Sequence, residues 1–130
     1  MLKKITHVTL YIPNQDEALE FYTKNLGFVL HTDAMFGPDL RWLTIVLPEQ
    51  KEVEIVLALP ESDEERALVG KQAGRKPFLA FSCDDCQKTH DDLKEKGVTI
   101  INAPEKQSWG TSMACADPWG NIIYIVEENA

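Results

Sequence analysis

The start of the chain alternates hydrophobic and polar positions in a way that predicts a strand, a helix and a second strand. Residues 5–12 are rich in β-branched side chains and alternate, which is typical of a strand. Asn14 followed by Glu17 three residues later is typical of a helix start. Apolar residues at helical spacing then lead to Gly27, a residue common at helix ends, and residues 28–31 begin another strand.

The second half of the chain repeats this order of elements. His7 in the first strand corresponds to Phe78 at an offset of 71 residues, and Gly27 corresponds to Gly97 at an offset of 70. A repeat of this kind indicates two modules with the same architecture. The elements predicted for the second half are a strand at 78–83, a helix at 84–96 and a strand at 98–101.

Each half continues with two more predicted strands joined by a polar turn. They lie at 41–47 and 53–59 in the first half, and at 112–116 and 121–126 in the second. The chain is therefore predicted to be α+β, with two βαβββ modules whose curved mixed sheets form around a cleft. We predict a single domain, 1–130, with module 1 at about 1–60, a connector with a short helix at about 61–76, and module 2 at about 77–130.

Composition and charge exclude several classes of partner. The chain has 130 residues, with 13 Lys+Arg against 21 Asp+Glu, and so a formal net charge of −8. This excess of acidic groups repels phosphate backbones, so we expect neither nucleic acid nor a membrane as a partner. The three cysteines favour a cytoplasmic location over a disulfide framework.

Motifs in both halves resemble those of the vicinal oxygen chelate superfamily, which contains glyoxalase I, bleomycin-resistance proteins and extradiol dioxygenases. In the first half these are His7 and the later segment 21–28, FYTKNLGF; in the second half the segment 117–121 reads DPWGN. The resemblance covers nearly the whole chain. It implies the paired-module fold, a small-molecule ligand and a homodimer.

The resemblance also implies where a catalytic metal would be held, on the first and last strands of each module. These positions fall on His7, Phe78 and Tyr124, and on either Glu54 or Ile55. Phe78 cannot ligate a metal, and Tyr124 stands where the metal enzymes have glutamate, whereas a catalytic site needs at least three ligands. We therefore predict a metal-free cavity with no cofactor. The alternative is a metal-dependent lyase, isomerase or dioxygenase that uses His7 and Glu54.

Strand alternation places a mixed set of side chains on the predicted cavity face. His7, Thr9 and Tyr11 share one face of their strand, and a lining of aromatic and polar groups suits an apolar or aromatic ligand. We predict binding of a small, partly apolar molecule, with the cavity either within one chain or across a dimer. The expected ligand-binding residues are His7, Thr9, Tyr11, Phe78 and Tyr124, together with Arg41 as a partner for a carboxylate and Trp109 at the cavity mouth.

A C-x-x-C motif formed by Cys83 and Cys86 offers a third hypothesis, a thiol-redox protein. Redox cysteines of this spacing need a stabilised thiolate. The two aspartates between the cysteines oppose the thiolate, so the motif is predicted to be structural.

Overall fold

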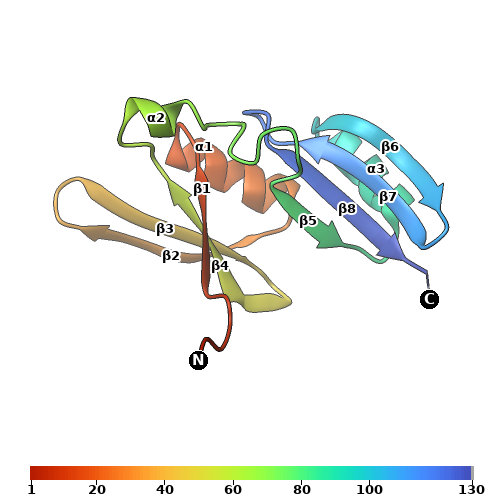
Figure 1. The fold of residues 1–130 in the computed structure, drawn as a ribbon, viewed down its shortest axis with the longest axis horizontal. Helices are drawn as coiled ribbons and strands as arrows, with labels where there is room; N and C mark the ends of the chain where they lie inside the picture. The colour runs from red at the N-terminus through yellow and green to blue at the C-terminus, as the bar shows by residue number, and fades with distance from the viewer. Residues whose placement is uncertain (130) are drawn as a thin grey trace. The chain divides into compact units, whose positions relative to one another are not determined.

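Both halves of the chain fold as a four-stranded mixed sheet with a helix, in a computed structural model that describes residues 1–129 (Figure 1). The chain divides into unit 1, Met1–Val69, and unit 2, which begins at Gly70. This confirms the predicted α+β class and the βαβββ order in each half. No helix in the described residues is long and apolar enough to cross a membrane.

Unit 1 contains a sheet in which β1 runs parallel to β4 and the other neighbours are antiparallel, in the order β1-β4-β3-β2. One face of this sheet packs under the helix, where Leu10, Leu43 and Leu57 are fully buried together with Tyr22. The elements of unit 1 are β1 (His7–Tyr11), α1 (Gln15–Glu20), the π-helical η1 (Phe21–Asn25), β2 (Val29–Phe36), β3 (Leu40–Leu47), β4 (Gln50–Ala58) and α2 (Asp63–Arg66).

The helix of unit 1 begins where the sequence predicts. The Asn14 side chain accepts a hydrogen bond from the backbone N–H of Glu17 at 3.0 Å, which satisfies a helix donor that would otherwise be unpaired. The last turn widens into η1, and Gly27 ends it with φ +83°, a conformation that favours glycine.

Unit 2 repeats this arrangement, with β5 parallel to β8 and the sheet order β5-β8-β7-β6. Its helix-facing core contains Leu93, Met113 and Ile123. Asp85 caps the helix by accepting the backbone N–H of Lys88 at 3.0 Å. The elements are β5 (Leu79–Ser82), α3 (Cys86–Glu95), β6 (Thr99–Gln107), β7 (Gly110–Ala116) and β8 (Ile122–Glu128).

Two strands extend at least five residues beyond their predicted C-terminal ends. The strand expected at 28–31 extends to Phe36, and the strand expected at 98–101 extends to Gln107. Both contain shifts in pairing register, between Leu30 and Thr32 in β2 and at two places in β6. A β-bulge breaks the alternation of side chains, so these extensions carry no period-2 pattern.

The DPWGN motif forms the turn between β7 and β8. Asp117 is buried, and its carboxylate accepts the backbone N–H groups of Trp119 and Asn121 at 3.1 and 2.9 Å. Its other oxygen accepts the Asn121 side-chain amide at 2.7 Å. The aspartate and asparagine of the motif therefore hold the turn in shape.

Candidate functional site

The two faces of the unit 1 sheet differ in burial, as the alternation along β1 predicts. His7 and Thr9 are exposed, whereas Leu10 and Ile12 are fully buried on the side of the helix. We call the face that carries His7, Glu54, Thr44 and Trp42 the His7 face. It is the part of unit 1 on which polar and aromatic groups are brought together.

The centre of the His7 face is a cluster of two histidines and a glutamate. His7 Nε2 lies 3.1 Å from Glu54 Oε2, and His31 Nδ1 lies 3.0 Å from Glu54 Oε1. The histidine side chains are 41% and 43% exposed, whereas that of Glu54 is only 18% exposed. The carboxylate is therefore held between two imidazoles that remain open to solvent.

Thr44 and Trp42, both on β3, complete the surroundings of this cluster. The fully buried Thr44 donates its hydroxyl to Glu54 Oε1 at 2.8 Å. The rings of Trp42 and His7 lie 6.0 Å apart at an angle of 56°. Glu54 thus has a donor from each of three strands, β1, β2 and β3.

His31 belongs to the site because of the irregularity in β2. The pairing of β2 with β3 shifts register between Leu30 and Thr32. His31 therefore reaches Glu54 on the His7 face, although its neighbour Thr32 pairs with Thr44 on that same face. In a regular strand, adjacent residues point to opposite faces. His31 was not predicted from the sequence, because hydrophobic periodicity carries no signal for a bulge at this place.

Of Glu54 and Ile55, between which the sequence left the choice open, only Glu54 lies on the face of His7. Glu54 pairs with His7 and shares its face, whereas Ile55 is buried on the helix side. Ile55 is therefore excluded as a site residue.

The repeat also shows which residue of unit 1 matches Tyr124. Tyr124 pairs with Ala80 in unit 2, two residues after Phe78. The corresponding pair in unit 1 is Thr9 with Val56, two residues after His7. The repeat therefore assigns the last-strand position of unit 1 to Val56, and to neither Glu54 nor Ile55, which were expected there. Glu54 lies two residues before Val56 on the same face.

The donor set does not fit the catalytic metal that the resemblance implies. The two imidazoles contact different oxygens of Glu54 at hydrogen-bond distance, so the carboxylate lies between them. Among the described residues, no three His, Cys, Asp or Glu side chains are arranged to hold a metal ion. The cluster is therefore built as a hydrogen-bonded unit of side chains.

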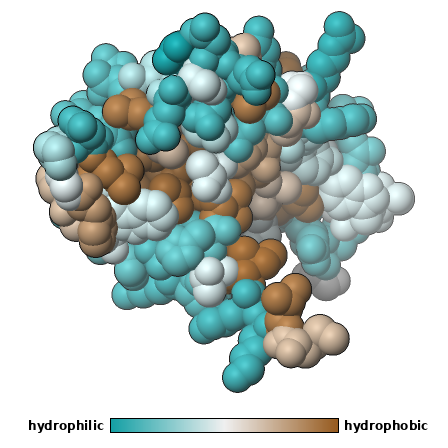
Figure 2. All heavy atoms as spheres, turned by 60° about the vertical axis from the view of Figure 1, so that its left-hand side comes forward, coloured by the Kyte–Doolittle hydropathy of each residue, from teal (hydrophilic) through white to brown (hydrophobic). Residues whose placement is uncertain are grey.

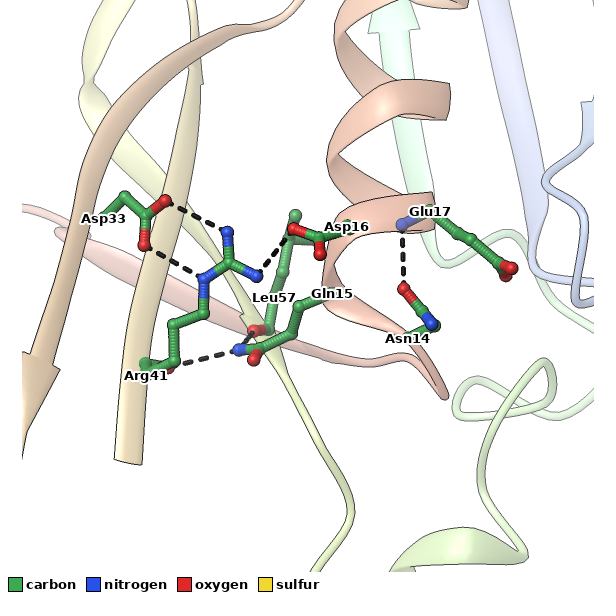
Figure 3. A network of polar contacts seen from close by, with 7 residues as sticks. All are labelled: Asn14, Gln15, Asp16, Glu17, Asp33, Arg41 and Leu57. Atoms are coloured by element: carbon green, nitrogen blue, oxygen red, sulfur yellow. Dashed lines mark hydrogen bonds and ion pairs between the residues drawn. The ribbon is translucent and has the colours of Figure 1, made fainter. Parts of the chain in front are cut away.

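Arg41 lies on the other face of the sheet and is engaged by two carboxylates (Figure 3). It binds both oxygens of Asp33, each at 3.0 Å, and Asp16 Oδ1 at 2.8 Å. The hydrogen bonds with Asp33 and then Asp16 raise the pKa of Arg41, and Arg41 in turn lowers the pKa of Asp33. The side-chain amide of Gln15 also donates hydrogen bonds to the backbone carbonyls of Arg41 and Leu57. Arg41 thus links helix to sheet and is separated from His7, Thr9 and Tyr11.

The other expected residue of unit 1, Tyr11, is half-buried and contacts the connector. Burial and the neighbouring Glu65, which hydrogen-bonds to the phenol, raise the pKa of Tyr11. The phenol is therefore protonated at neutral pH.

Three expected ligand residues, Phe78, Trp109 and Tyr124, belong to unit 2. The Phe78 backbone N–H donates to the Ile122 carbonyl at 2.8 Å, and Tyr124 follows on the same face of β8. Trp109 is exposed in the turn between β6 and β7. Phe78 thus lies directly before β5, Tyr124 lies on the face of β8 opposite to the buried Ile123, and Trp109 lies at the tip of the β6–β7 hairpin.

Apolar side chains extend the His7 face towards the β2–β3 hairpin. Phe36 pairs with Leu40, and Ala34 pairs with Trp42, so these residues share a face. Phe36 is 60% and Leu40 45% exposed. Figure 2, which turns the left-hand side of Figure 1 forward, shows hydrophobic side chains at the surface among hydrophilic ones.

A small pocket lies beside Trp42 in unit 1. Its volume is about 90 Å³, and its lining includes Gln15, Leu40, Trp42 and Glu61. Pockets for drug-sized ligands have volumes of roughly 300–1,000 Å³. This pocket alone can take a substituent of such a ligand but not the whole molecule.

The C-x-x-C motif shows no sign of thiolate stabilisation. Both cysteines are free, and Cys86 is fully buried. Burial, followed by the nearby Cys83, raises the pKa of the Cys86 thiol to about 11. The Cys86 backbone N–H at the helix start is taken by Glu127 at 2.7 Å. This environment disfavours thiol-redox chemistry.

The sequence matches one protein family and several solved structures. Residues 4–125 match the model of the "Glyoxalase/Bleomycin resistance protein/Dioxygenase superfamily". The Bacillus subtilis (strain 168) protein YurT is 35% identical over 127 residues, which cover 96% of this chain and 99% of that protein.

Among solved structures, UcmS2 is 34% identical with a TM-score of 0.85, covering 97% of this chain and 98% of its own. TnmS3, described as an antibiotic binding protein from Streptomyces sp. CB03234, has a TM-score of 0.77 at 23% identity, with 98% of both chains covered. The likeness to TnmS3 shows a shared fold.

Proposed function

Since the chain belongs to the Glyoxalase/Bleomycin resistance protein/Dioxygenase superfamily, we propose that it binds a small, partly apolar molecule without a resident metal ion. The ligand is placed on the His7 face of unit 1. One observation carries the proposal: the same face presents the exposed imidazoles of His7 and His31 and, next to them, the apolar side chains of Trp42, Leu40 and Phe36.

The chemistry of this face suits a ligand with an apolar body and a polar group. Trp42, Leu40 and Phe36 offer apolar surface, and burying it gains about 25 cal/mol for each Å². The histidine–glutamate cluster beside them supplies directional hydrogen bonds, which fix the orientation of a bound molecule.

The residues at the implied metal positions support a metal-free site. His7 is the one strong ligand among them, because the other positions hold Val56, Phe78 and Tyr124. The tyrosine would have to lose its proton to become a good ligand. A reaction that uses His7 and Glu54 with a metal would need a third ligand near them. The nearby His31 contacts the other oxygen of Glu54, and among the described residues no such group of three is arranged to hold a metal ion.

The solved structure of TnmS3 favours binding over catalysis as the first function to test. That protein is described as binding an antibiotic, and it shares the fold over 98% of both chains. We carry over the class of function, binding of a small molecule, and not the identity of its ligand.

The test is a binding screen with a tryptophan variant and a matched control. Aromatic antibiotics and aromatic metabolites are screened by thermal shift, and positive compounds are measured by isothermal titration calorimetry. We expect saturable binding that weakens about tenfold or more in Trp42→Ala, because a buried aromatic contact is lost, and that is unchanged in Trp119→Ala, in the β7–β8 turn. A screen without saturable binding, or equal affinities for both variants, would contradict the proposal.

We also propose that the protein acts as a homodimer, as the family resemblance implies. Light scattering coupled to size-exclusion chromatography tests this. A mass near twice the 14.7 kDa of one chain is expected, and a mass that stays at 14.7 kDa at high concentration would contradict it.

A further inference from the structure

We propose that His31 recognises a hydroxyl group of the bound molecule, by accepting its hydrogen bond at Nε2. The inference rests on the proposed binding function and narrows it to a class of ligand, aromatic or apolar molecules that carry a neutral hydroxyl. The assignment follows from the way Glu54 fixes the tautomers of the two histidines.

Glu54 is a carboxylate with only acceptor oxygens when it is ionised. Its Oε1 already receives the Thr44 hydroxyl at 2.8 Å and lies 3.0 Å from His31 Nδ1. A lone pair on Nδ1 would face the charged oxygen and be repelled, whereas a proton on Nδ1 forms a charge-assisted hydrogen bond. Glu54 therefore holds neutral His31 with its proton on Nδ1.

The proton on Nδ1 leaves Nε2 of His31 as an acceptor. A neutral imidazole carries one N–H and one lone pair, so fixing the first determines the second. Thr32 Oγ1, 2.8 Å from Nδ1, lies on the same side of the ring as Glu54. The polar contacts of His31 with Glu54 and Thr32 are both made through Nδ1, and its side chain is 43% exposed. Within residues 1–129 no polar contact is made through Nε2, which therefore remains open to a donor from outside the chain.

His7 is held in the opposite tautomer and has no such open nitrogen. Its Nε2 faces Glu54 Oε2 at 3.1 Å and so carries the proton. Its Nδ1 is then the acceptor, and it lies 3.0 Å from the Thr6 hydroxyl, which can donate to it. Both nitrogens of His7 are used within the chain. Between the two imidazoles, His31 is thus the one that offers an open acceptor to a ligand.

The neighbours of His31 explain why the donor should belong to a partly apolar molecule. Thr32 pairs with Thr44, and the next pair along the same face is Ala34 with Trp42. The apolar end of the His7 face therefore begins two residues from Thr32, about 7 Å along the strand, within reach of a molecule whose hydroxyl binds His31. An ionised carboxylate only accepts hydrogen bonds, so it has no proton to donate to Nε2.

The first measurement is the tautomeric state of the histidines, by long-range ¹H–¹⁵N NMR of the full chain at a pH where both are neutral. We expect the proton on Nδ1 in His31 and on Nε2 in His7, and we expect Glu54→Gln to abolish the preference in His31. Nε2-protonated His31 in the wild-type protein would overturn the proposal, with no variant required to fold.

The second measurement compares 2-naphthol with 2-methoxynaphthalene, which has the same rings but no donor. At neutral pH the naphthol keeps its proton, and we expect the protein to prefer it by about tenfold, the gain from one net hydrogen bond. The preference should disappear in His31→Phe. It should persist in His90→Phe, because His90 also contacts a carboxylate, Asp91 at 3.0 Å, but belongs to α3 in unit 2.

The outcomes separate this inference from the proposed function. Equal affinities for the two naphthalenes, or a naphthol preference that survives in His31→Phe, would overturn the role of His31 and leave the binding function standing. If neither compound binds saturably, the inference that the ligand carries a hydroxyl would be contradicted. The wider antibiotic screen would still decide whether the protein binds small molecules.

Discussion

Gly70 packs against the DPWGN turn so closely that an alanine side chain has no space. A Cβ atom at this position would lie 1.8 Å from the Trp119 carbonyl oxygen and 2.8 Å from its carbon. The backbone φ of +80° is also unfavourable for alanine. Because both neighbouring atoms belong to the backbone, the turn itself must move to accept the methyl group.

The chain contains a matched control for this substitution. Gly74 has a similar φ of +67°, but a Cβ atom there would meet nothing within 4 Å. Gly74→Ala should therefore lower the free energy of unfolding only by the cost of the left-handed conformation, about 1 kcal/mol. Gly70→Ala should lower it by that amount and by a further ~2 kcal/mol for the steric clash. For a chain of this length, the difference corresponds to a gap of roughly 6–10 °C in Tm.

The two free energies of unfolding are measured by urea titration, with circular dichroism as the signal. We expect unequal losses with similar dependence on urea concentration, because the surface exposed on unfolding does not change. If Gly70→Ala and Gly74→Ala lost the same stability within about 0.5 kcal/mol, the close packing of the turn would be refuted as the reason for glycine at position 70.

Three further predictions concern the ion network, the thiols and the metal. The lowered pKa of Asp33 means that its pairing with Arg41 stabilises the fold above the ordinary pKa of an aspartate and is lost as the pH falls through the lowered value. The stability deficit of Arg41→Met should therefore shrink on acidification in urea titrations, and a deficit that is independent of pH would contradict the pairing. Iodoacetamide should modify Cys83 before Cys86 as followed by mass spectrometry, because burial raises the pKa of Cys86 to about 11; faster labelling of Cys86 would show that its thiol is accessible. Elemental analysis after loading with divalent metals should find far less than one equivalent per chain, whereas one equivalent that is lost in His7→Ala would favour the metal-dependent alternative.

The fold was largely predictable because each half carries strong local signals. The alternation of hydrophobic and polar residues predicted β1. Asn14 and Gly27 predicted the start and the end of the helical region, because a side-chain cap and a left-handed glycine have direct physical causes. The limits of β2 and β6 were not predictable from periodicity. Their pairing shifts register, and such shifts depend on contacts with the neighbouring strand.

The site was predictable only in part. His7 lies on an exposed face as expected, but its partner depended on the register between β1 and β4, which a single sequence does not specify. His31 was missed because a bulge brings it to Glu54. Arg41 was expected to bind a ligand carboxylate, and the structure shows its charge already paired with Asp16 and Asp33. The role of each expected ligand residue stays a prediction.

The contact between His31 and Glu54 depends on one extra residue in β2. Deletion of a single codon in the bulge would restore a regular ladder between β2 and β3 while removing the second imidazole from Glu54. A related chain could thus keep every core residue and still lack the imidazole that we propose as the acceptor for a ligand hydroxyl. We therefore expect relatives that lack this bulge to lack the preference for a hydroxyl that we propose for His31.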